Sequence, residues 1–217
     1  AANAVTMSQI GKKPMFVLSF LCAIVCFLFS GFALFYASRT SIALESSFLW
    51  LSNDNINFYL GTLIDKTSGV FLCIAALLNV LVQLYGWMKL NKNYSYNRLL
   101  FYQNLFVFGL FGIFLASNIL QSYMFCEVLG VASYLLINFD FSNKEESKAA
   151  IKSFIFNRIG DLTLLFCVLT ILYFSVTYNQ LWDSTNLAFS NMTQVAESIN
   201  SLMSEPLFVG FCSILIF

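Results

Sequence analysis

The stretch that decides the fold reads CEVLGVASYLLINF over residues 126–139 and, after a short charged turn, KAAIKSFIFNRIGD over residues 148–161. Both segments belong to apolar runs long enough to cross a bilayer as helices. Each run nevertheless carries a carboxylate, Glu127 in the first and Asp161 in the second. Placing an acid at the centre of a bilayer costs about 3 kcal/mol or more, so an intramembrane carboxylate indicates a functional site.

The composition of the whole chain indicates a membrane protein. Of 217 residues, 59% are hydrophobic and 10% are charged, whereas a soluble domain carries about 25% charged residues. The net charge is zero, so nucleic acid is not an expected partner. The chain has no histidine, and none of its six cysteines lies in a CxxC motif, so we expect no haem, metal or iron–sulfur cluster in it.

The apolar runs predict an all-α, polytopic bundle of transmembrane helices with five full spans and the start of a sixth. The five predicted spans cover residues 14–37, 61–88, 99–116, 119–139 and 148–175. Residues 38–60 are predicted to form a polar connection, and Gln83, inside the second span, is expected to bond across helices.

This pattern divides the chain into four parts. Residues 1–13 form an N-terminal tail, and residues 14–175 form the five-helix transmembrane part. Residues 176–205 are predicted to be an amphipathic connection on the outer side. Residues 206–217 would begin a further transmembrane helix, which we expect another chain to complete.

The distribution of Lys and Arg predicts the orientation. Three basic clusters, before the first span, between the second and third, and between the fourth and fifth, fall on one side of the membrane. The positive-inside rule places the start of the first span on the matrix or cytoplasmic side. At 1.5 Å per residue, Glu127 and Asp161 then both lie about 18 Å from the inner face.

The basic residues near these acids allow several interpretations. Arg158 precedes Asp161 by three residues and is its expected local partner, either as a structural ion pair or as part of a transport path. Lys148 and Lys152 share a helix face, and snorkelling to the headgroups is favoured for them over a transport role. Glu127 has no base one turn away on its own helix, which favours a titrating role.

The two quoted motifs, GxxSYLLI and KAAIKxFxxNRxGD at this separation, resemble the fifth and sixth membrane helices of the antiporter-like subunit 5 of respiratory complex I, the proton-pumping NADH:ubiquinone oxidoreductase. The resemblance covers about residues 60–175. The sequence is similar, more distantly, to the large subunits of multi-subunit sodium/proton antiporters.

The resemblance implies a role for each charged residue. Glu127 matches the protonatable glutamate on the uptake side of the half-channel, Asp161 the acid that closes the NRxGD motif, and Arg158 its basic neighbour. Lys148 and Lys152 would line the approach of protons from the matrix side. The lysine that works with the glutamate in this family would fall beyond Phe217, so the resemblance implies a split subunit whose second half is a separate chain.

Three departures from the family pattern are visible. Cys126 stands where the family usually has Trp, Gln83 where it often has His, and Ser117 where it commonly has Asp. They indicate a divergent version of the subunit.

The function implied is that of a proton-translocating membrane-arm subunit of NADH:ubiquinone oxidoreductase in the mitochondrial inner membrane. The chain would do no redox chemistry, because flavin, iron–sulfur clusters and quinone would belong to other subunits. The alternatives are a subunit of a multi-subunit cation/proton antiporter and a structural scaffold in which the two acids only fix helix packing.

The predicted location can be tested at Asn191, which begins the glycosylation acceptor pattern Asn-Met-Thr on the predicted outer side. In a mitochondrial inner membrane this site stays unmodified, so glycosidase treatment is expected to leave the mass of the chain unchanged. A glycosidase-sensitive mass shift would indicate a secretory membrane and contradict the mitochondrial location.

Overall fold

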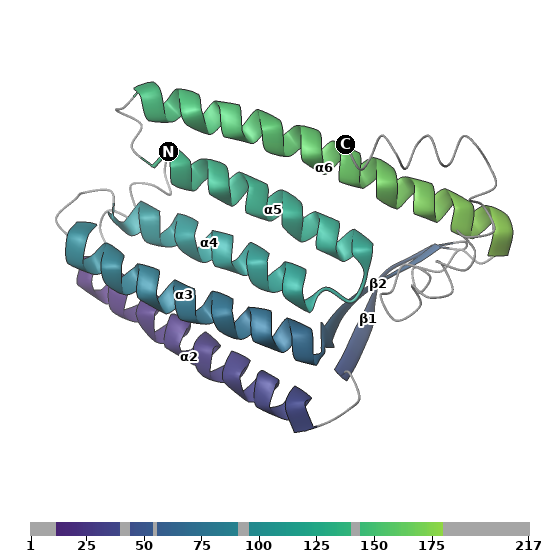
Figure 1. The fold of residues 1–217 in the computed structure, drawn as a ribbon, viewed down its shortest axis with the longest axis horizontal. Helices are drawn as coiled ribbons and strands as arrows, with labels where there is room; N and C mark the ends of the chain where they lie inside the picture. Colours follow the sequence, from purple (N-terminus) through teal and green to yellow (C-terminus); the bar gives the residue numbers. More distant parts are fainter. Residues whose placement is uncertain (1–11, 40–43, 54–55, 91–95, 140–143, 180–217) are drawn as a thin grey trace.

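Five helices and one β-hairpin make up the part of the chain that the structure, a computed structural model, describes: residues 12–39, 44–53, 56–90, 96–139 and 144–179. The elements are α2 (Lys12–Arg39), β1 (Leu44–Asn53), β2 (Ile56–Ile64), α3 (Lys66–Leu90), α4 (Tyr96–Leu115), α5 (Ile119–Ile137) and α6 (Lys144–Asn179). Figure 1 shows the helices side by side in chain order, with the hairpin at one end. The predicted helical bundle is confirmed.

Four described helices are long and apolar enough to cross a membrane: Pro14–Arg39, Lys66–Lys89, Tyr96–Leu115 and Ile119–Ile137. The sequence predicted five spans, and the fifth corresponds to α6, which is not one of these four. α6 packs along α5 (Figure 1). The structure therefore bears out four of the spans by length and composition, and the fifth stays a prediction.

Side-chain caps fix where two of the helices begin. The Ser68 N–H donates to Asp65 Oδ1 at 2.7 Å, and the Asp65 N–H donates to Ser68 Oγ at 2.9 Å, which together cap α3. The Gln121 N–H donates to Asn118 Oδ1 at 2.7 Å and caps α5, which begins at Ile119 as predicted. Asp65 thus acts as the cap of α3.

The segment predicted as a polar connection is an antiparallel hairpin, paired from Leu44 with Ile64 to Asn53 with Ile56. The predicted start of a helix at Gly61 is therefore wrong. The reason is tertiary: the Gly61 N–H donates to Gln121 Oε1 at 3.0 Å, and Gln121 Nε2 donates to the Gly61 carbonyl at 2.9 Å. Both peptide groups of Gly61 are held in β2 by a side chain of α5.

Helices α4 and α5 approach closely at two glycines. A Cβ on Gly109 would lie 3.2 Å from the Leu129 backbone nitrogen, and one on Gly112 would fall within the Phe125 ring. No larger residue fits at Gly112 unless the Phe125 ring moves. Gln83 is fully buried, and its Nε2 donates to Asn104 Oδ1 at 3.0 Å, so the predicted cross-helix bond is confirmed.

Several predicted segments lie outside the described residues. They are most of the tail 1–13, the amphipathic connection from residue 180 onward and the start of a helix at 206–217. Residues 176–179, predicted to open that connection, instead continue α6.

The close approach predicts opposite effects for two glycine-to-alanine variants. Gly112→Ala is expected to lower the free energy of unfolding by about 1–3 kcal/mol, because the added methyl group overpacks the α4–α5 contact. Gly31→Ala in α2 meets nothing within 4 Å and is expected to stabilise its helix by up to about 1 kcal/mol. Thermal unfolding in detergent measures both. An unchanged or higher midpoint for Gly112→Ala would contradict the close approach.

Candidate functional site

The charged site lies at the contact between α5 and α6. The Arg158 guanidinium on α6 forms an ion pair with Glu127 Oε2 on α5. The side chains are partly buried, with 24% of Glu127 and 35% of Arg158 exposed. Glu127 lies about 12 Å along the axis from the start of α5 and about 15 Å from its end, so the pair sits near mid-helix.

A tyrosine on α5 also hydrogen-bonds to Glu127. The Tyr123 hydroxyl donates to Glu127 Oε1 at 2.7 Å. The two residues are four positions apart on α5, a spacing that places side chains on one helix face. The sequence interpretation missed Tyr123, although this spacing from an intramembrane acid was visible.

Asp161 does not pair as predicted. The predicted partnership of Arg158 with Asp161 is wrong in this structure, because Arg158 reaches across to Glu127. Asp161 Oδ2 is buried and accepts no hydrogen bond from the described residues. Asp161 Oδ2 lies 3.6 Å from the position that a Cβ atom on Gly130 of α5 would occupy. Arg158 still attracts Asp161 electrostatically from one turn away.

The two lysines lie apart from this site. Lys148 Nζ is 3.6 Å from Glu145 Oε1, and both side chains are largely exposed, at 75% and 84%. Lys152 is also exposed. Lys148 and Asp161 are 13 positions apart on α6, which corresponds to about 20 Å. These positions agree with lysines at the membrane interface and not with contact to either acid.

Two further contacts hold α6 against α5, and a third, within α6, positions Arg158. Asn157 Nδ2 donates to Ser133 Oγ at 3.4 Å. The Arg158 guanidinium carbon lies 4.8 Å from the centre of the Phe154 ring, a cation–π contact that shields one face of the charge. The Phe154 ring in turn packs against Tyr134 with ring centres 5.3 Å apart. The guanidinium is thereby oriented toward α5.

The described residues contain no cluster of three or more Cys, Asp, Glu or His side chains that could hold a metal ion. Cys22, Cys26, Cys73 and Cys126 are free thiols. Of these, Cys126 precedes Glu127 and lies near enough to Asp161 to interact electrostatically with it.

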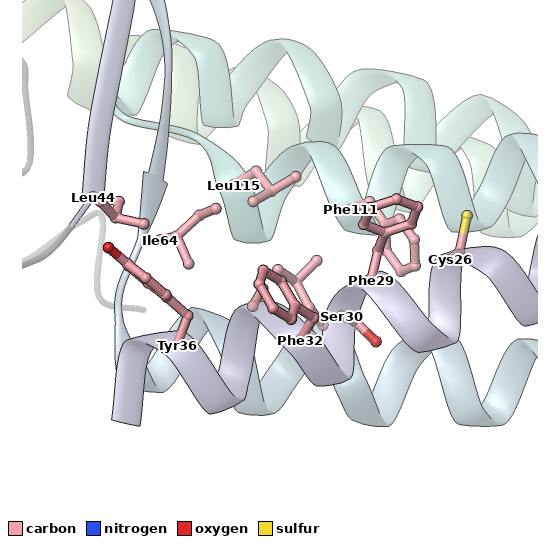
Figure 2. A pocket seen from close by; sticks show the side chains of 11 residues that line it. Cys26, Phe29, Ser30, Phe32, Tyr36, Leu44, Ile64, Phe111 and Leu115 are labelled. Carbon is pink, nitrogen blue, oxygen red and sulfur yellow. The ribbon is translucent and has the colours of Figure 1, made fainter. Parts of the chain in front are cut away.

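A separate pocket of about 410 Å³ lies beside the hairpin. Figure 2 shows it bounded by Phe29, Phe32 and Tyr36 of α2 on one side and by Leu44 and Ile64 of the hairpin on the other. Its lining contains no acid or base. The pocket suits an apolar group and does not belong to the charged site.

The site holds two carboxylates and one cation. A guanidinium keeps its charge at any pH at which proteins fold. Arg158 can therefore compensate one acid fully while the other keeps its proton or finds a hydrogen bond elsewhere. In the structure the cation pairs with Glu127, and Asp161 Oδ2 accepts no hydrogen bond from the described residues.

Four membrane-length helices, one of which forms a cross-helix ion pair with α6, define a polytopic membrane protein with charged side chains inside its helix bundle. The family model for the transmembrane region of NADH:quinone oxidoreductase and Mrp antiporter subunits matches residues 116–215, which include Glu127, Arg158 and Asp161. Over these residues the chain is similar to this family of antiporter-like membrane subunits, and its curated relatives are of the subunit 5 type.

Among these relatives is chloroplastic NAD(P)H-quinone oxidoreductase subunit 5 from Chara vulgaris, 36% identical over 78% of this chain and 24% of the relative. The protein of the same name from Cichorium intybus is 29% identical over 91% of this chain and 26% of the relative. The chain spans about a quarter of the length of the curated relatives it matches.

Two solved structures share the fold. The archaeal membrane-bound sulfane sulfur reductase aligns with a TM-score of 0.59 and 14% identity over 81% of this chain and 37% of the matched one. The Mrp complex from a Dietzia species aligns with a TM-score of 0.59 and 18% identity, over 95% of this chain and 23% of the matched one.

The pairing of Glu127 with Arg158 is testable by a double-mutant cycle. Glu127→Gln and Arg158→Met alone are each expected to destabilise the protein, because each leaves a partly buried polar group without its partner. The loss of unfolding free energy in the double variant is expected to be smaller than the sum of the two single losses. The difference is expected to be about 1 kcal/mol or more. Thermal unfolding in detergent gives the values. Strict additivity would contradict the ion pair.

Proposed function

We propose that this chain forms the uptake half of a proton path in the membrane arm of an NADH:quinone oxidoreductase, with Glu127 as the group that takes up and releases the proton. The observation that carries the proposal is that two carboxylates lie at the α5–α6 contact with one cation, Arg158, which pairs with Glu127 and leaves Asp161 Oδ2 without a hydrogen bond from the described residues. The similarity to this family supports it, because the curated relatives are named as subunits of a quinone oxidoreductase.

The proposed mechanism is an exchange of partners by Arg158. While Arg158 pairs with Glu127, the carboxylate is held ionised. Asp161 lies one turn further along α6 with a carboxylate oxygen that accepts no hydrogen bond from the described residues, so it is an alternative partner for the same guanidinium. When Arg158 turns to Asp161, Glu127 loses its counter-charge and takes a proton.

Protons would reach Glu127 from the matrix side through water near the end of α6 that carries Lys148 and Lys152. Release would follow a change of charge on a lysine supplied by polypeptide outside these 217 residues, in our proposal by a separate chain. The chain would work as a translocating subunit without redox chemistry. Flavin, iron–sulfur clusters and quinone would belong to other subunits.

The proposed setting is a large membrane complex. The fold relatives include a respiratory membrane complex and an antiporter complex, which supports assembly with other membrane-arm subunits. We propose the mitochondrial inner membrane, with the start of α2 on the matrix side. The curated relatives are named as chloroplastic, so fractionation of the two organelles is the direct test of this location.

Two other functions make different predictions. An independent cation/proton antiporter would use the same acids, and the Mrp fold relative favours it as the second candidate. The native complex would then contain no flavin or iron–sulfur subunits. A scaffold would use Glu127 only for packing.

The decisive variant is Glu127→Gln, measured in the assembled complex as protons moved per electron transferred. We expect normal assembly and quinone reduction, with fewer protons per electron, because a carboxamide cannot carry the proton. The matched control is Glu145→Gln, the same change at an exposed acid at the start of α6. An unchanged proton yield would exclude the role of Glu127, and loss of assembly would favour the scaffold.

A further inference from the structure

A second feature inside the bundle has no part in the charged site. A groove of about 510 Å³ runs between α3 and α4, and Leu136 of α5 also lines it. Its lining is apolar except for the amide side chains of Asn79 and Gln103. Along α4 it extends from Leu99 to Phe114, about 22 Å or four helical turns.

The two amides end a chain of hydrogen bonds that crosses three helices. Asn104 Nδ2 donates to Ser19 Oγ of α2 at 2.7 Å, and Gln83 Nε2 donates to Asn104 Oδ1 at 3.0 Å. Gln83 Nε2 also donates to Asn79 Oδ1 at 3.3 Å, and Gln103 Nε2 donates to the same oxygen at 3.1 Å. This series of hydrogen bonds therefore runs from α2 to Gln103 at the groove.

At the groove this series of hydrogen bonds ends in a side-chain oxygen that accepts no hydrogen bond from the described residues. Gln103 uses its Nε2 for the bonds to Asn79, and among the described residues no group donates to Gln103 Oε1. Gln103 is 6% exposed, and it lines the groove. Inside a bilayer an amide oxygen without a donor is unfavourable, so whatever fills the groove is expected to supply one.

The depth of these amides argues against an acyl chain as the occupant. Asn79 is 13 positions from the start of α3 and 11 from its end, which places it about 16–20 Å from both. Lipid tails carry no hydrogen-bond donor at this depth. A helix with a hydroxyl or amide side chain does, and such side chains hydrogen-bond between membrane helices.

We propose that the α3–α4 groove seats a membrane-spanning helix of a neighbouring polypeptide in the complex, which donates a hydrogen bond from a hydroxyl or amide side chain to Gln103 Oε1. The interface does not depend on the proton role of Glu127. Its four-turn length matches a helix lying along α3 and α4.

Two leucines of α3 give a matched test by photo-crosslinking. Leu78 lines the groove, Leu81 does not, and each is 52% exposed. Each is replaced in turn by p-benzoyl-phenylalanine in the full chain within its native membrane complex. After irradiation, mass spectrometry identifies the crosslinked peptides. We expect the probe at position 78 to crosslink a membrane-spanning peptide of another subunit that carries a Ser, Thr, Asn, Gln, Tyr or Trp donor. Its crosslinking yield is expected to be at least five times the yield at position 81.

A second variant tests the hydrogen bond itself. Gln103→Leu, in a complex shown to assemble, is expected to lower the yield at Leu78 severalfold and leave the yield at Leu81 unchanged. The proposal is overturned if Leu78 captures only lipid, a second copy of the chain or a peptide from residues 180–217. Equal yields at Leu78 and Leu81, or an unchanged yield in Gln103→Leu, overturn it as well.

Discussion

The ion pair between Glu127 and Arg158 is the interaction on which the placement of α6 depends. In a bilayer an isolated carboxylate or guanidinium is strongly unfavourable, so each charge requires the other. Arg158 is the only cation that the described part of the chain brings to the two acids, and it lies on the helix that carries Asp161. The cross-helix pair therefore stabilises α6 against α5 and leaves Asp161 without a direct partner.

The same constraint operates without charge in α2, α3 and α4. Amide and hydroxyl side chains there hydrogen-bond to one another across three helices, although the buried Gln83 Oε1 receives no donor from the described residues. The two polar systems differ in kind. Neutral amides fix the relative positions of helices, whereas the charged site holds more acids than it can compensate and so can exist in more than one arrangement.

The sequence was sufficient for those features that depend on composition along the chain. Long apolar runs predicted the helices to within a few residues, and the cross-helix bond of Gln83 was predicted from a polar side chain inside an apolar span. The hairpin could not be predicted, because its second strand is fixed by Gln121, 60 residues away from Gly61. The partner of Arg158 was missed for a similar reason. Spacing along α6 favoured Asp161, and only the packing of two helices brings Glu127 closer.

The bond pair between Gln121 and Gly61 has a mechanical consequence. A side-chain amide there occupies the position that a third strand would take, so the hairpin is joined to α5 as if it were part of the same rigid body. Gln121 and Glu127 are six residues apart on that helix, about 9 Å along its axis. Any tilt or rotation of α5 would therefore displace the hairpin together with the helix that carries Glu127.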